Sequence, residues 1–254
     1  MRKRLLRGVT SAVVAVALAL PGGARPAAAV DPGTIATIIG AATGLFNFIK
    51  GLNSGGLSLE SATRQIIAAV DNAKTAIIVE VDRVAAAQAK ACATRAVIEV
   101  ADIERFNPDV LQQWAQDATG CVTLIDSLIS TVSDPGSIDQ LGVALNVVGP
   151  IAVLARGRAG FSTTSLQPLL RQANLNIIAR LAPTCSSVRV AEPGAPVVEI
   201  QHTCTAYNGD AAYETQTSYR GRPFQPPTVD LVALGHVATR NTSRAIALAV
   251  LPLI

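Results

Sequence analysis

The sequence predicts a mainly α protein: an elongated helical bundle with a small disulfide-clamped antiparallel β subdomain and a C-terminal helix. Three observations predict this fold. Long stretches between residues 31 and 181 carry apolar side chains at helical spacing. Residues 185–219 are instead rich in Val, Thr and Tyr and contain two turn signals, Pro193-Gly194 and Asn208-Gly209. The four cysteines lie in pairs, each pair placed symmetrically about a predicted turn.

Residues 1–29 have the composition of a secretory signal peptide. Four basic residues between positions 2 and 7 precede an apolar run over 9–20, and Ala27-Ala28-Ala29 is a small-residue pattern that signal peptidase cleaves. We expect cleavage after Ala29 and disulfide formation in an oxidising compartment. No cysteine lies directly after the cleavage site, where a bacterial lipid anchor would need one, and the apolar C-terminus is only ten residues long, too short to span a bilayer. Release into the extracellular medium is therefore predicted.

The net charge of +3 is misleading, because five of the 21 basic residues and none of the 18 acidic residues lie in 1–29. The mature chain thus has 16 basic and 18 acidic groups. A nearly neutral protein lacks the positive field that nucleic-acid binding needs, so no nucleic-acid partner is expected. The excess of Arg over Lys is typical of proteins from GC-rich bacterial genomes.

The first helices follow from apolar periodicity. A Gly-interrupted helix is predicted over 31–52 and a loop over 53–56. Ser58 is expected to cap a long helix that reaches Phe106, about 70 Å if unbroken. No Gly or Pro requires an interruption, although the sequence does not establish continuity. Arg95 falls on the apolar face of this long helix. Three roles are open for it: an ion pair with an acidic residue of a neighbouring helix, a position where the packed surface ends, or a contact with a ligand. Acidic residues near its end are expected to form a solvated face: Glu99, Asp102 and Glu104.

Three further helices are predicted beyond Asn107-Pro108. The first runs from Pro108 to about Val132. Ser137 and Gln140 have the spacing of a capping box and are expected to open a helix that is apolar almost all round, kinked at Pro150 and buried. Thr164 and Gln167, at the same spacing, are expected to open a helix that ends near residue 181.

Four cysteines allow three disulfide connectivities, and their positions favour one of them. Cys92 and Cys121 each lie about 14 residues from the predicted turn at Asn107, so in a helical hairpin both would sit about 21 Å along their helices. Cys185 and Cys204 are related in the same way about Pro193–Pro196. If these two face each other, Val188 and Val190 point to the opposite face from Val198 and Ile200, which a single-residue bulge would correct.

The C-terminal segment returns to helical character. Thr228 is expected to cap a last helix that continues through Leu248 and packs back on the bundle. The predicted organisation is a signal peptide at 1–29, a helical bundle at 30–183, a β subdomain at 184–227 and the C-terminal helix at 228–254.

The chain is poor in catalytic groups. Its two histidines, His202 and His236, are expected to be packed structural residues, and no recognised hydrolase, redox, nucleotide or metal motif occurs. We therefore predict no catalytic site, no cofactor and no metal site, and a protein that is not an enzyme.

All three tyrosines lie in the β segment. Tyr213 and Tyr219 would share one face of a strand with Thr215 and Thr217, where aromatic rings flanking hydroxyl groups could stack on a sugar or a peptide. The candidate contact surface comprises Tyr207, Tyr213, Tyr219, Arg220 and Arg222. The leading prediction is a secreted, non-enzymatic binding protein whose partner is a protein, a glycan or a membrane. The oligomeric state is left open.

A membrane-inserting helical effector is the alternative. The segments 35–49 and 141–154 are strongly apolar, and the first contains Gly40 and Gly44 at the spacing of close-packed membrane helices. Both resemble segments that helical pore-forming toxins keep folded away until they meet a bilayer.

Overall fold

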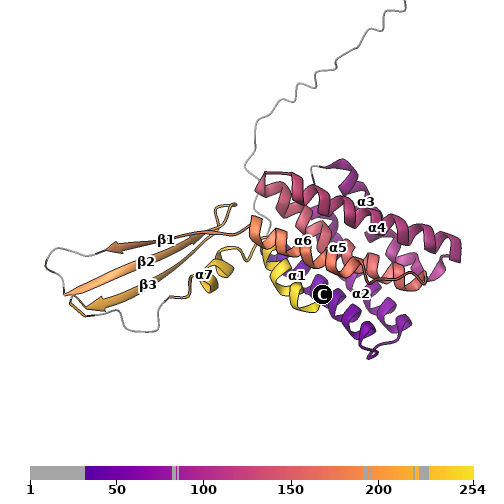
Figure 1. The fold of residues 1–254 in the computed structure, drawn as a ribbon, viewed down its shortest axis with the longest axis horizontal. Helices are drawn as coiled ribbons and strands as arrows, with labels where there is room; N and C mark the ends of the chain where they lie inside the picture. Colours follow the sequence, from indigo (N-terminus) through magenta and orange to yellow (C-terminus); the bar gives the residue numbers. More distant parts are fainter. Residues whose placement is uncertain are drawn as a thin grey trace, which may run out of the picture.

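The structure is a computed structural model that describes residues 32–81, 84, 86–190, 194, 196–219, 221–222 and 229–254. The predicted signal peptide and the predicted link 223–227 lie outside these residues. The described chain is mainly helical with a small three-stranded antiparallel sheet, as the sequence predicts. The helices form a bundle, and the sheet projects from one end of it as an arm (Figure 1). We call the sheet together with helix α7 the arm.

The first two helices, α1 (Pro32–Asn53) and α2 (Leu59–Val81), pack against each other. Ser58 caps α2 as predicted, because its Oγ accepts a hydrogen bond of 3.1 Å from the amide of Ser61.

The helical segment predicted from Ser58 to Phe106 is interrupted, which settles the continuity that the sequence left open. The chain ends α2 at Val81 and continues as α3 (Ala87–Glu99) and a short 3-10 helix, η1 (Val100–Arg105). The interruption is explained by the length of the neighbouring helices. An unbroken helix of about 70 Å would be twice as long as a 24-residue helix such as α4, about 36 Å, so half its apolar stripe would have no cover. The break allows both parts to pack against one core, and Val84 in the connection is buried.

Helix α4 (Pro108–Thr131) begins where the sequence predicts. The side chain of Asn107 accepts a hydrogen bond of 2.9 Å from the amide of Val110, and Pro108 takes the first helical position. The disulfide between Cys92 and Cys121 joins α3 to α4 with Cα atoms 5.6 Å apart, which confirms the predicted pairing.

Helix α5 (Pro135–Arg158) is the centre of the bundle, and α1, α2, α3, α4, α6 and α8 all contact it. Almost every side chain between Ile138 and Ala155 is buried, as its all-round apolar character predicts. The helix continues through Pro150. The predicted capping box at Ser137 is wrong: Asp134 is the cap, and its carboxylate accepts hydrogen bonds from the amide and hydroxyl of Ser137 at 2.7 and 2.8 Å. Pro135 prefers the first helical position, which moves the helix start forward.

Helix α6 (Leu166–Arg180) begins two residues later than the proposed Thr164 cap. Its Ncap residue, Ser165, makes no side-chain capping bond, and Thr164 is instead hydrogen-bonded to Ser162, so this predicted capping box is also wrong. At the other end of α6, Arg180 donates hydrogen bonds to the backbone carbonyls of Ile129 and Val132. These carbonyls lie at the C-terminal end of α4, where they lack partners within the helix.

The C-terminal segment forms two helices where one was predicted. Helix α7 (Leu231–Ala238) packs on the sheet, whereas α8 (Ser243–Val250) packs against α1, α5 and α6 and leads into η2 (Leu251–Leu253). The cap is Asp230, whose carboxylate accepts from the amides of Val232 and Ala233; the predicted Thr228 cap lies outside the described residues. The chain must divide here because α7 and α8 serve different cores, one in the arm and one in the bundle.

Candidate contact surface

The sheet contains β1 (Thr184–Val190), β2 (Val197–Thr205) and β3 (Ala211–Tyr219), with β2 in the middle. Cys185 lies opposite Cys204, and the disulfide between them, with Cα atoms 4.0 Å apart, confirms the second predicted pairing. Both disulfides are typical of a protein that folds in an oxidising compartment.

The predicted bulge in β1 is wrong. The register is continuous from Thr184 opposite Thr205 to Val190 opposite Glu199, so Val188 and Val190 remain on the face opposite the disulfide. No core requires them to be turned inward, because that face of the sheet is open: Val188 is 59% and Val190 41% exposed.

One face of the sheet is covered by α7. Cys204 and Ala212 on this face are buried against Leu234 and Ala238 of the helix, in a small core separate from that of the bundle. Gly235 allows the close approach, since a Cβ at this position would lie 2.9 Å from the ring of Pro183. The disulfide and this core fix the base of the arm.

The other face carries the two exposed tyrosines, and we call it the tyrosine face. Successive side chains alternate between the faces of a strand, so the register defines its members. They are Thr184, Ser186, Val188, Val190, Val197, Glu199, Gln201, Thr203, Thr205, Ala211, Tyr213, Thr215, Thr217 and Tyr219.

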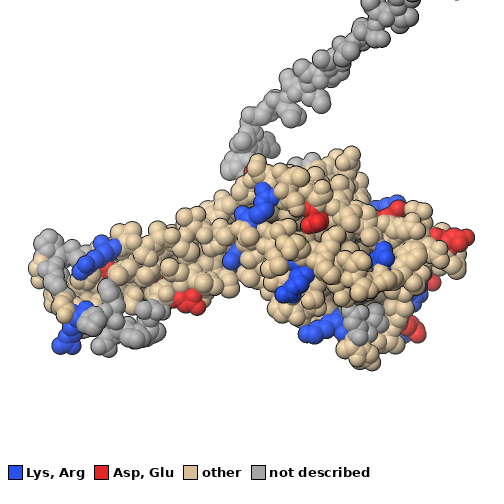
Figure 2. Space-filling model, viewed as in Figure 1, with Lys and Arg blue, Asp and Glu red and all other residues tan. Residues whose placement is uncertain are grey.

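The tyrosine face is open and almost without charge. Tyr213 is 74% and Tyr219 63% exposed, and Thr215 and Thr217 between them are exposed as well. Glu199 is the one charged residue among the fourteen residues of this face. In Figure 2 most of the described surface of the arm is tan, which marks residues other than Lys, Arg, Asp and Glu. Among the described residues, no other surface combines exposed tyrosines with a row of hydroxyl groups.

Tyr207 lies apart from the other two tyrosines. It sits in the turn between β2 and β3, and its phenol donates a hydrogen bond of 2.6 Å to the carboxylate of Asp139 near the start of α5. Asp139 is 2% exposed and also accepts from the amide of Ser243 at the start of α8. Tyr207 therefore ties the arm to the bundle.

Burial raises the pKa of Asp139, and the hydrogen bonds from Tyr207 and Ser243 oppose this shift in part. A second tie lies beside the first, where the side-chain amide of Asn241 donates to Asp210 at 2.8 Å. Sequence reasoning missed this polar junction. The available signal was a single carboxylate in a helix that is otherwise apolar nearly all round.

The other predicted site residues are distributed as follows. Arg222 is exposed in the turn after β3, where its amide donates to the carbonyl of Tyr219, and Arg220 lies outside the described residues. His202 lies on the covered face with Nδ1 2.8 Å from the hydroxyl of Ser187, as expected of a hydrogen-bonded structural residue. His236 is exposed on α7, contrary to the packed position expected for it. No cluster of three or more metal-ligating side chains occurs in the described part of the chain.

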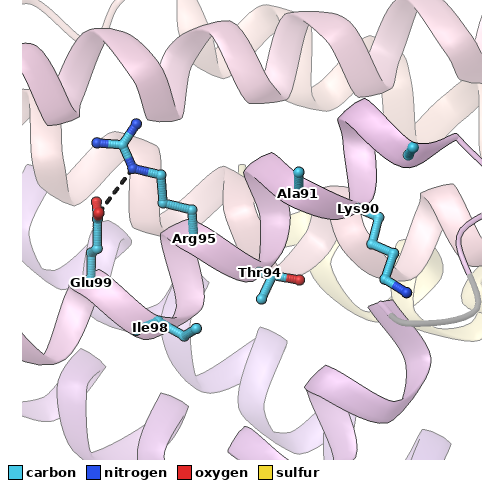
Figure 3. A pocket seen from close by; sticks show the side chains of 7 residues that line it. Lys90, Ala91, Thr94, Arg95, Ile98 and Glu99 are labelled. Carbon is cyan, nitrogen blue, oxygen red and sulfur yellow. Dashed lines mark hydrogen bonds and ion pairs between the residues drawn. The ribbon is translucent and has the colours of Figure 1, made fainter.

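The bundle has a hollow of about 590 Å³ along α3, lined by residues that include Lys90, Thr94, Arg95 and Ile98 (Figure 3). Arg95 is engaged within the protein, as one of the sequence-based readings predicted. Its Nε lies 2.9 Å from Glu99, and its Nη1 lies 2.9 Å from Asp117 on α4. The hydrogen bond to Glu99 is the largest cause that raises the pKa of Arg95. With both carboxylates bound, this guanidinium joins two helices and does not offer a ligand site.

Two helices are long and apolar enough to cross a membrane, over Gly33–Gly51 and Pro135–Arg158. The second is 94% buried as the core helix of the bundle. Gly40 is exposed, and a Cβ there would meet nothing within 4 Å, so this pair of glycines does not mark a close helix contact here. Gly142 and Gly149 in α5, by contrast, are closely approached by side chains of the neighbouring helices.

The chain matches no protein-family model, no curated protein and no solved structure.

Proposed function

We propose that the protein is a secreted, non-enzymatic binding protein that presents the tyrosine face of its arm to a partner outside the cell. The observation that supports this most is the exposure of Tyr213 and Tyr219 on a face where no other described element packs. Exposed large aromatic side chains on one open face are typical of binding surfaces, because a partner that covers them removes apolar area from water.

The construction of the arm supports the same proposal. The Cys185–Cys204 disulfide and α7 hold the covered face, and Tyr207 and Asn241 tie the base to the bundle. A surface held rigid before binding loses little conformational entropy when a partner is bound. The two cysteine pairs and the N-terminal segment 1–29 support secretion.

The test measures binding of the oxidised, fluorescently labelled protein to cells and culture medium of the producing organism, for the unmodified protein and for two variants. The double variant Tyr213→Ala/Tyr219→Ala is expected to lose binding. Ile98→Ala removes an exposed apolar side chain from the bundle instead and is expected to bind as the unmodified protein does. Equal binding by the double variant would contradict the proposal, and unchanged thermal unfolding would show that all variants fold.

A further inference from the structure

We propose that the tyrosine face binds a linear, uncharged polysaccharide that lies along β3 with a sugar ring stacked on Tyr213 and another on Tyr219. This inference rests on the proposed function, and it names the chemical class of the partner.

The spacing of the two rings sets the length of the ligand. Tyr213 and Tyr219 are six residues apart on one strand, which places them about 20 Å apart along β3. A monosaccharide or a single side chain cannot contact both rings. Thr215 and Thr217 stand between them on the same face, at intervals of about 7 Å. This row of ring, hydroxyl, hydroxyl and ring fits an extended chain that runs parallel to the strand.

The chemistry of the face sets the class of that chain. Eight of its fourteen side chains carry a hydroxyl group, one carries a carboxylate, and none is Lys or Arg. Hydroxyl groups both donate and accept hydrogen bonds, which matches a ligand made of hydroxyl groups. An anionic polymer would find no Lys or Arg among the residues of this face and would be repelled by Glu199. The aromatic rings add apolar area on which the C–H faces of a neutral sugar can stack.

The size of the face argues against a second copy of this chain as the occupant. Strands of nine residues, about 30 Å long, and a width of about 15 Å give a flat area of about 450 Å². A stable protein–protein interface needs about 800 Å² from each partner. A narrow polymer needs only the strip along β3.

The test measures retardation of the oxidised protein by neutral polysaccharides in native gels, with soluble β-glucan, α-glucan and mannan as probes, and sedimentation with insoluble cellulose and chitin. Heparin and polygalacturonate are the anionic comparisons. We expect at least one neutral polymer to bind. Tyr213→Ala and Tyr219→Ala should each weaken binding about tenfold, since a ring contact contributes up to about that factor. Tyr→Phe at either position should change binding less than threefold, and Ile98→Ala should not change it.

Length dependence gives a second expected result. Oligosaccharides of the bound polymer that are too short to reach both rings should bind more weakly than the polymer and should lose sensitivity to one of the two Tyr→Ala substitutions. Chains that span both rings should respond to both substitutions.

Several results would overturn the inference: no neutral polymer binds, an anionic polymer binds instead, or binding is unaffected by the double Tyr→Ala variant. The binding to cells and medium described above separates the two proposals. If that binding requires Tyr213 and Tyr219 while no neutral polysaccharide binds, the polysaccharide inference fails and the proposed contact surface stands. If neither kind of binding requires the tyrosines, both fail.

Discussion

The packing around α5 predicts that Gly→Ala lowers the free energy of unfolding at two glycines and raises it at two others. Gly→Ala is introduced at Gly142 and Gly149, where α5 is closely approached, and at Gly40 and Gly120, which lie in the open on α1 and α4. All four positions are inside helices, so the gain in helix propensity is shared by all four variants. Differences among them therefore measure tertiary packing.

The magnitudes follow from the space at each site. A Cβ at Gly149 would lie 2.6 Å from Cδ2 of Leu170, and one at Gly142 would lie 2.8 Å from Cβ of Ser243 and also clash with its hydroxyl. Leu170 and Ser243 are fully buried, so moving either side chain displaces the residues packed around it. Overpacking of this kind costs about 1–3 kcal/mol, which exceeds the propensity gain of up to about 1 kcal/mol. We expect net losses of about 1–2 kcal/mol at both positions.

Beyond the adjacent residues and the helix's own backbone, no atom lies within 4 Å of a Cβ at Gly40 or Gly120. Gly→Ala at these positions should therefore raise the free energy of unfolding by the full gain in helix propensity, about 0.5–1 kcal/mol. The assay is urea unfolding of the oxidised protein, with the midpoint and slope measured for each variant. If Gly142→Ala and Gly149→Ala stabilise as much as Gly40→Ala, then α8 and α6 do not lie against α5 as described, and the account of the core is refuted.

Three further predictions concern the disulfides, the buried carboxylate and the membrane. Replacing Cys92 and Cys121 with Ala should lower the free energy of unfolding by roughly 3–4 kcal/mol, since the bridge closes a loop of 29 residues; a loss under 1 kcal/mol in urea unfolding would contradict this. Because burial raises the pKa of Asp139 above its unfolded value, folding favours the neutral form of this group relative to the unfolded chain. The stability from this group is therefore fully present below the unfolded pKa and is lost as pH rises through the folded pKa. The stability of Asp139→Asn relative to the unmodified protein should thus increase from pH 4 to pH 8, and a constant or reversed difference would count against it. Dye-loaded liposomes should stay sealed with the oxidised protein, because α5 is buried under six other helices; rapid release would favour membrane insertion.

The sequence predicts well those elements that local signals determine. Asn107 and Pro108 begin α4 where expected, since a cap and a favoured first residue occur together. Both disulfides follow from the symmetry of the cysteines about their turns. The apolar character of α5 predicts its burial.

The predictions that failed depend on tertiary structure. The sequence between α2 and α3 contains no helix-breaking Gly or Pro that would predict the interruption. The interruption is explained instead by the length of the neighbouring helices. The division of α7 from α8 follows from the existence of two cores, which no local pattern reveals. The predicted bulge assumes that Val188 and Val190 must face a core, whereas both lie exposed on the open face of the sheet.

The candidate site was predicted in part. The alternation of side chains along a strand places Tyr213 and Tyr219 together on one face with Thr215 and Thr217, as the sequence indicates. The separate role of Tyr207 could not be predicted, because its partner Asp139 lies 68 residues away in sequence and belongs to another element.

The most direct test of the central claim is chemical modification of the three tyrosines by nitration, with and without the cell or medium fraction that binds the protein. In the free protein Tyr213 and Tyr219 should react first, while Tyr207, 37% exposed and hydrogen-bonded to Asp139, should react slowly and serve as the internal control. When the protein is bound, we expect Tyr213 and Tyr219 to be protected and Tyr207 to be unchanged. Unaltered modification of Tyr213 and Tyr219 at saturation would show that the partner binds elsewhere on the molecule.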